Sequence, residues 1–268
     1  MTFIDSLRNY LSPQILVILC LGFISGVPYG VLMDPLNYWL SEEGIEKSTI
    51  GLLSLVFLIY SLKVFWAPLV DRLKIPGLHS LGQRKSWLFL SQFVTGLIIF
   101  SISFVEPKES LNIFVYLILA IGFFSATQDI CADALRIELV EKRELGEASA
   151  VFVIGWRIGA ILLSGVATFY LAEFFGWNFA YQMIGIIVIF LSFIFLILIR
   201  EPTRETRPPK DFFKEPLVWF QDSFLAPLKD LYLRYQNHLL LLLLLIFTYR
   251  LSDMFLGPMA MPFYRETG

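Results

Sequence analysis

Charged residues are scarce in this sequence. Asp, Glu, Lys and Arg make up 16% of its 268 residues, against about 25% in a typical soluble domain. The formal net charge is only −2, and no basic block interleaved with aromatic residues is present to suggest binding to nucleic acid. Hydrophobic residues reach 57% of the chain, a composition that indicates a protein embedded in a lipid bilayer.

Cysteine is also scarce. The two cysteines, Cys20 and Cys131, both fall within apolar stretches. A free thiol in such surroundings behaves as a small buried hydrophobic group. We therefore expect neither a disulfide nor a metal site from this pair, and the sequence predicts no cofactor.

Apolar stretches long enough to cross a membrane recur along the chain. A helix needs about 20 mostly apolar residues to cross the bilayer core, and a strand is excluded because its backbone groups would lack partners in lipid. The stretches that qualify are Gln14–Trp39, Ser48–Val70, Ser86–Val105, Leu111–Ala134, Ala148–Ala172, Ala180–Ile199 and His238–Tyr264. The sequence therefore predicts an all-α integral membrane protein, whose first stretch is too long for a cleaved signal.

Lysine and arginine are unevenly shared between the two sides that these spans define. Of the 21, fifteen lie on the side of Arg8, whereas Lys47, Lys108 and Arg265 lie on the other. Loops rich in Lys and Arg stay in the cytoplasm. We therefore expect a cytoplasmic N-terminus, a cytoplasmic linker after the sixth span, and an external end after the seventh.

The linker between the sixth and seventh spans is charged and rich in proline. Apolar residues then recur between charges at near-helical spacing, with Pro216 and Pro227 breaking the pattern or starting turns. This pattern predicts an amphipathic helix on the membrane surface, and a docking site for another protein is the alternative. We expect three parts, namely a six-helix bundle at 1–200, the linker at 201–236 and a seventh transmembrane helix at 237–268.

A few charged residues fall inside the apolar spans. On scales derived from membrane insertion, each such charge costs roughly 2.5–3.5 kcal/mol at the centre of the bilayer. Because charges this costly are rarely kept without a use, these residues are candidates for function. They are Asp34, Lys63, Asp129, Asp133, Arg157, Arg250 and Asp253.

The fourth span carries two of these charges. Asp129 and Asp133 are one helical turn apart and share a face, with Gln128 beside them. Two neighbouring carboxylates in a low dielectric cannot both ionise cheaply, so the pair is a candidate proton carrier. Asp133 alone can also anchor the cytoplasmic end of the span. The same spacing occurs where prenyltransferase-type enzymes hold Mg²⁺, although a second aspartate-rich cluster is missing here.

Two other spans carry an arginine. Arg157 lies between Gly155 and Gly159, which permit close helix packing, and it requires an anion, either a neighbouring aspartate or an acidic substrate. Arg250 and Asp253 are three residues apart in the seventh span. They either neutralise each other or contact a substrate.

The remaining charges belong to the first two spans. Asp34 follows glycines and a proline that loosen the first span, and broken helices line cavities in transporters. Tyr29, Tyr38 and Trp39 can stack on a sugar there, and Tyr38 and Trp39 also fit interfacial anchors. Lys63 can extend its long stem toward the cytoplasmic edge, so we expect little role for it in a site.

The end of the second span resembles the gating loop of the major facilitator superfamily. It reads Ala67-Pro68-Leu69-Val70-Asp71-Arg72 and is followed by Gly82-Gln83-Arg84-Lys85, with Ala67 in place of the family's glycine. Asp71 can bind the N-terminal end or an arginine of a neighbouring helix and hold one conformation. Asp71, Arg72 and Arg84 are therefore the expected gating residues.

Further segments resemble the AmpG muropeptide permease family in the same order. They are Lys63–Arg72, Ser125-Ala126-Thr127-Gln128-Asp129, Gly155-Trp156-Arg157-Ile158-Gly159 and Arg250-Leu251-Ser252-Asp253. The resemblance covers essentially the whole chain. It implies a symporter of the bacterial inner membrane, not an enzyme, that imports anhydro-muropeptides for cell-wall recycling and is driven by protons.

This interpretation assigns roles to the charged residues. Asp129 and Asp133 carry protons, while substrate contacts come from Asp34, Gln128, Arg157, Arg250 and Asp253. A facilitator for acetyl-CoA, peptides or drugs is the alternative, ahead of the prenyltransferase-like enzyme. Because such transporters have two six-helix halves and on the order of 400 residues, we expect a truncated product, a fragment, or a chain that pairs with a separate second half.

Overall fold

The computed structural model describes residues 12–199, 201, 218, 221, 225–245 and 248. Within these residues every regular element is helical, as the sequence predicts. The chain divides into two compact units, Met1–Glu205 and Thr206–Gly268.

Helices long and apolar enough to cross a membrane fill the first unit. Six are found in the described part of the chain: Pro13–Glu42, Lys47–Phe65, Gln83–Ile102, Leu111–Glu138, Lys142–Phe175 and Trp177–Leu198. Each overlaps one of the first six predicted spans. The seventh predicted span lies largely outside the described residues, although residues 239–245 are helical.

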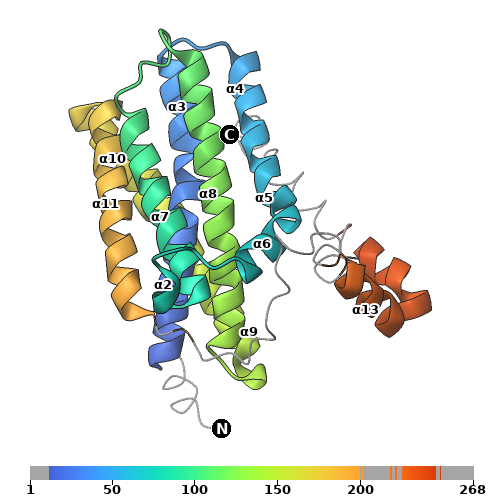
Figure 1. Ribbon diagram of the computed structural model, residues 1–268. Helices are drawn as coiled ribbons and strands as arrows, with labels where there is room; N and C mark the ends of the chain where they lie inside the picture. The colour runs from blue at the N-terminus through green and yellow to red at the C-terminus, as the bar shows by residue number, and fades with distance from the viewer. Residues whose placement is uncertain are drawn as a thin grey trace, which may run out of the picture. The chain divides into compact units, whose positions relative to one another are not determined.

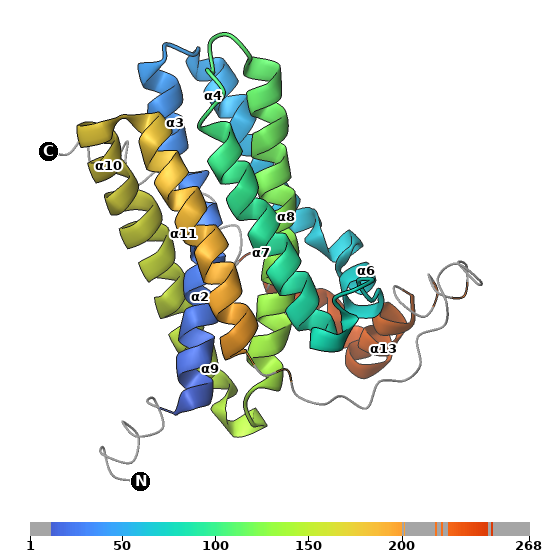
Figure 2. The same cartoon turned by 60° about the vertical axis from the view of Figure 1, so that its left-hand side comes forward.

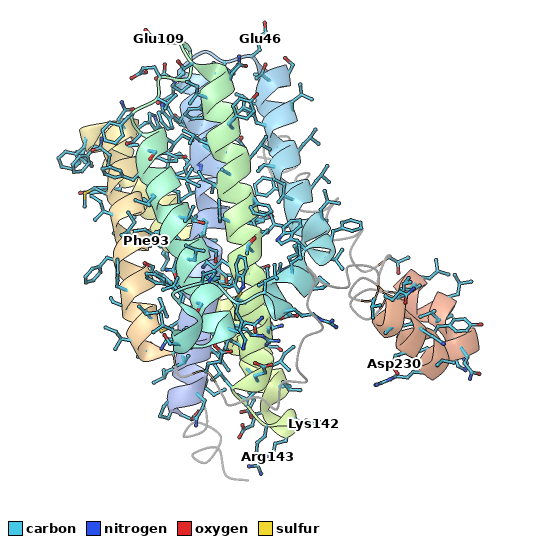
Figure 3. All side chains as sticks on the ribbon, viewed as in Figure 1. Glu46, Phe93, Glu109, Lys142, Arg143 and Asp230 are labelled. Carbon is cyan, nitrogen blue, oxygen red and sulfur yellow. The ribbon has the colours of Figure 1, made fainter. Side chains whose placement is uncertain are left out.

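The six spans pack side by side as a bundle, which Figures 1 and 2 show from two directions. Lys142 and Arg143 lie at one end of it and Glu46 and Glu109 at the other (Figure 3). We call the end with Lys142 the inner end and the end with Glu46 the outer end. By the distribution of Lys and Arg, the inner end is the one predicted to face the cytoplasm.

The first span lies between two others. Its first helix, α2 (Pro13–Val31), packs against α8 (Leu111–Glu138) and against the first two segments of the fifth span, α9 (Leu145–Arg157) and η5 (Ile158–Ala167). The third span, α7 (Gln83–Ile102), packs against α8, and it also packs against the sixth span, α11.

Facing glycines bring α2 and the fifth span into close contact. A Cβ added at Gly22 or Gly26 would lie 2.1 Å from the carbonyl oxygen of Phe152 or Trp156. A Cβ at Gly155 would likewise lie 2.1 Å from a backbone carbonyl of α2. The prediction that glycines permit close helix packing is therefore confirmed at this contact.

The first and fifth spans are irregular. The first changes direction after Val31 and resumes as α3 (Asp34–Glu42), with Pro35 in its first turn. In the fifth span, π-helical η5 lies between α9 and α10 (Thr168–Phe175). In contrast, α7, α8 and α11 (Trp177–Leu198) are continuous.

The second span is the most broken. It is built from short α-helical and 3₁₀ segments, namely α4 (Lys47–Leu53), η1 (Ser54–Phe57), α5 (Leu58–Leu62) and η2 (Lys63–Phe65), and it is followed by α6 (Ala67–Arg72). Pro68 has no N–H to bond the carbonyl oxygen of Val64, so regular helix cannot continue through this point.

Buried apolar residues form two clusters along the bundle. The cluster toward the inner end includes Leu135 and Ala148, and the cluster toward the outer end includes Trp39 and Phe114. Cys131 belongs to the inner cluster and is a free thiol, as is Cys20. The expectation of a buried thiol in apolar surroundings is confirmed for Cys131, whereas Cys20 is partly buried and packs against the same cluster.

The second unit contains α13 (Ala226–Tyr235), which has Pro227 in its first turn. The prediction that this proline starts a turn is confirmed. Asp230 and Arg234 form an ion pair of 2.8 Å on an exposed face, while Tyr232 is 60% exposed. A helix is therefore present within the predicted amphipathic linker, and its position on a membrane surface stays a prediction.

The glycine contact gives a first prediction. We expect Gly26→Ala to lower the melting temperature of the purified protein, because its Cβ would meet a backbone oxygen that cannot move aside and overpacking typically costs about 1–3 kcal/mol. Gly146→Ala in α9 is the matched control, since a Cβ there meets nothing within 4 Å. The close packing would be contradicted if both variants melted like the parent protein.

Candidate functional site

The two aspartates of the fourth span meet a lysine of the second. Nζ of Lys63 donates to Oδ2 of Asp129 and lies 3.2 Å from Oδ2 of Asp133. Arg136 of α8 lies 3.3 Å from Oδ1 of Asp133. We call these four residues the Lys63 cluster. With all four ionised it holds two cations and two carboxylates, so its formal charge is zero.

Helix geometry explains how the cluster assembles. Asp129, Asp133 and Arg136 are separated by four and three residues, so they share one face of α8. Lys63 is supplied by the 3₁₀ turn η2, at the break in the second span. The side chains of Lys63, Asp129 and Asp133 are 26%, 21% and 39% exposed. Within the described bundle the protein therefore covers the cluster only in part.

Hydrogen bonds on either side of Lys63 hold the second span to α8. The hydroxyl of Tyr60 donates to Oγ of Ser125 over 2.8 Å, and Nε1 of Trp66 donates to Oγ1 of Thr127 over 3.0 Å. Both acceptors belong to the Ser125–Asp129 segment that the sequence singles out. This segment thus positions Lys63 as well as supplying its first carboxylate.

Gln128 holds α8 to the first span. Its Nε2 donates to the carbonyl oxygen of Ile24 over 3.0 Å, and the residue is 0% exposed. Its Oε1 has no hydrogen-bond partner among the described residues. The structure offers no surface of Gln128 to a solute in this conformation, and its expected contact with substrate stays a prediction.

Arg157 does not join the aspartates. It is exposed at the end of α9 and forms no ion pair with a described carboxylate. Of the two alternatives for Arg157, the salt bridge to Asp129 or Asp133 is absent among the described residues, and Lys63 takes that position. The other alternative, contact with an acidic substrate, stays a prediction.

The direction expected for the Lys63 side chain is wrong. Its ammonium group does not extend toward the cytoplasmic edge but turns to α8. One signal in the sequence pointed to it. Lys63 is the only cation within the predicted second span, whereas the fourth span holds two carboxylates that need one.

A second ionic group lies nearer the inner end. The guanidinium of Arg84, only 10% exposed, lies 3.3 Å from Asp71 of α6 and 2.9 Å from Glu138 of α8. The expected pairing of Asp71 with an arginine of a neighbouring helix is confirmed. Arg84 thereby connects α6, α7 and α8, and its action as a gate stays a prediction.

The N-terminus of α7 is capped by a residue that is far away in the sequence. The carboxylate of Glu201 accepts from the backbone N–H groups of Arg84 and Lys85 over 3.2 and 3.1 Å. A negative charge at a helix N-terminus is stabilising.

Arg72, the third expected gating residue, is the last residue of α6. Its gating role stays a prediction.

A cavity of about 810 Å³ opens toward the outer end, between the first and fifth spans. Its lining is rich in aromatic rings, including Tyr38, Trp156 and Trp177. Asp34 lies on its wall at the start of α3, and Nε1 of Trp177 donates to Glu42 over 2.6 Å. Asp34 and Tyr38 therefore share a cavity, as their expected roles require. Arg250 and Asp253 lie outside the described residues.

Comparison with known proteins gives consistent matches. The model of the Major Facilitator Superfamily matches residues 16–267. The AmpG 4 protein of Rickettsia felis is 38% identical over 252 residues, which are 94% of this chain and 59% of that protein. The anhydromuropeptide permease of Escherichia coli K12 is 33% identical over 249 residues, or 93% of this chain and 48% of the permease. The chain thus spans roughly half to three fifths of these relatives.

The Arg84 contacts give a second prediction. We expect Arg84→Gln to destabilise the protein by about 1.5–3 kcal/mol, the range for hydrogen bonds to charged groups, because it removes the buried cation that Asp71 and Glu138 share. Arg143→Gln is the control, since its pair with Glu141 is 77% and 71% exposed and such pairs contribute about 0–1 kcal/mol. Thermal unfolding of the purified variants measures the difference. Equal melting temperatures for the two variants would contradict a structural role of Arg84.

Proposed function

Because the chain belongs to the major facilitator superfamily and is similar over 93–94% of its length to AmpG proteins, we propose that it provides the N-terminal six-helix bundle of a proton-coupled importer. The cargo is an anhydro-muropeptide, taken across a bacterial inner membrane into the cytoplasm. The observation that carries the proposal is the Lys63 cluster, a set of partly exposed ionic groups deep in a membrane bundle.

The depth of the cluster fits a proton site. Asp129 lies nine residues before the end of α8 at Glu138, or about 14 Å along the helix at 1.5 Å per residue. Carboxylates at such depth are costly and mark proton relays or ion pathways in pumps and transporters. Asp129 is the proposed proton carrier and Asp133 its partner.

The ionic groups suggest how a proton changes the bundle. Protonation of Asp129 removes one of the two charges that hold Lys63, and with it part of the link between the second and fourth spans. The Arg84 contacts hold α6, α7 and α8 together at the inner end. Release at the cluster and rearrangement of these contacts are the proposed steps that open the inner end.

The outer cavity is the proposed point of entry for the cargo. Aromatic faces suit the apolar faces of sugar rings, and Asp34 can accept hydrogen bonds from sugar hydroxyls. The volume of about 810 Å³ lies within the range of small-molecule sites, about 300–1,000 Å³. Transport then runs from this cavity toward the inner end.

Uptake of labelled anhydro-muropeptide tests the proposal. The complete gene product would be expressed in cells that lack a permease of their own. We expect accumulation that rises as the external pH falls, since more Asp129 is then protonated, and that a protonophore abolishes. Asp129→Asn should reduce accumulation to the level of cells without the protein, because an amide cannot carry the proton.

Asp230→Asn is the matched control for that substitution, because Asp230 lies in an exposed pair on α13. It should leave uptake near that of the parent protein. Proton-driven accumulation that survives Asp129→Asn would overturn the assignment of the proton site. Failure of the parent protein to accumulate any muropeptide would overturn the assignment of the cargo.

A further inference from the structure

The Lys63 cluster suggests how a proton and a cargo are bound together. We propose that Lys63 binds a carboxylate group of the cargo, and that a proton on Asp129 frees Lys63 to do so. This inference rests on the proposed function and deepens it. It assigns the anion-binding role to Lys63 in place of Arg157.

Charge balance is the first argument. The cluster is neutral when Lys63, Asp129, Asp133 and Arg136 are all ionised. A cargo carboxylate entering this low-dielectric site adds one negative charge, and an uncompensated charge there costs several kcal/mol. One proton taken up by Asp129 restores neutrality. The cluster therefore accepts a proton and a carboxylate together more readily than either alone.

The distances show which cation is released. Asp133 has two cationic neighbours, Lys63 at 3.2 Å and Arg136 at 3.3 Å. When Asp129 is neutral, Arg136 still balances the charge of Asp133, and Lys63 is left without a carboxylate of its own. Its ammonium carries three N–H donors, and the Lys63 side chain as a whole is 26% exposed. A cargo carboxylate can therefore take the place that Asp129 gives up.

The elements packed around Asp129 bring no substitute cation. The α2 helix contains no Asp, Glu, Lys, Arg or His at all. On α5, the Tyr60 hydroxyl is bound to Ser125. From α9, the Phe152 ring packs on Arg136, 4.8 Å from its guanidinium carbon. Among the described residues in contact with this site, the positive charge that can be exchanged is that of Lys63.

The second span is built to let Lys63 move. Only 6% of its most apolar stretch is buried, against 50% for the fourth span. Lys63 also lies in a 3₁₀ turn that follows the five-residue helix α5. The Tyr60 and Trp66 hydrogen bonds hold the segment on α8, while the flexible four-carbon stem of Lys63 lets the ammonium exchange one carboxylate for another.

Chemical labelling of Lys63 tests its release without any cargo. The full chain in detergent would be treated with an acetylating reagent, and acetylation of Lys63 would be measured by mass spectrometry. We expect Asp129→Asn to raise acetylation several-fold over the parent protein at the same pH, with Asp230→Asn unchanged. Equal acetylation of Lys63 in the parent protein and Asp129→Asn would overturn the inference, whatever the cargo proves to be.

Binding measurements test the anion site itself. The probes are an anhydro-muropeptide and the same compound with every carboxylate amidated. Lys63→Gln should weaken binding of the first about tenfold or more, the worth of a charge-assisted hydrogen bond, and leave the second unchanged. Lys63→Arg should restore carboxylate binding. Equal weakening for both probes would mean that Lys63 has only a structural role.

Proton uptake on binding completes the test. In weakly buffered solution with a pH indicator, the parent protein should take up one proton per carboxylate probe, and Asp129→Asn should bind the probe without proton uptake. Proton uptake that persists in Asp129→Asn would overturn the inference.

A second variant covers the case in which Lys63→Gln does not fold. The charge-balanced double variant Lys63→Gln/Asp129→Asn then replaces it, and it should show neither carboxylate preference nor proton uptake. Absence of muropeptide binding by the parent protein would instead count against the proposed cargo.

Discussion

The cost of an unpaired charge in a low dielectric governs the arrangement of this bundle. Lys63 satisfies it by reaching across to Asp129 and Asp133, and so holds the second span on the fourth. Arg84 satisfies it between Asp71 and Glu138. Because each contact joins different helices, the same ion pairs that remove the cost of burial also hold those helices together.

The sequence predicts the parts of the fold that depend on local patterns. Apolar length locates the spans, and the glycines around Arg157 predict a close helix contact, whose partner α2 is known only from the structure. Lys63 is different because its partner is 66 residues away and its direction depends on a break in the helix. A prediction that treats the second span as one continuous helix cannot show that its 3₁₀ turn directs Lys63 toward α8.

The spacing of Arg157 from its neighbouring glycines determines the side of the helix on which it lies. Gly155 and Gly159 face α2, where an added Cβ would lie 2.1 Å from backbone oxygens. Arg157 is two residues from each glycine, which at 3.6 residues per turn is about 200° around the helix. It therefore lies on the side opposite α2. The glycines that made Arg157 conspicuous in the sequence also direct it away from its expected partners, since α2 lies against α8 on its other side.

The irregular helices and the continuous helices have different places in the bundle. The first, second and fifth spans are broken, and they border the outer cavity or supply Lys63. The continuous helices α7, α8 and α11 provide the frame, with Asp129 and Asp133 fixed on one of them. Segments of 3₁₀ and π-helix are frequent at functional sites, and here they occur in the spans that supply Lys63 or border the outer cavity. In the proposed coupling the aspartates stay in place on α8 while the lysine moves, so an exchange of charge at one point would be passed to the second span.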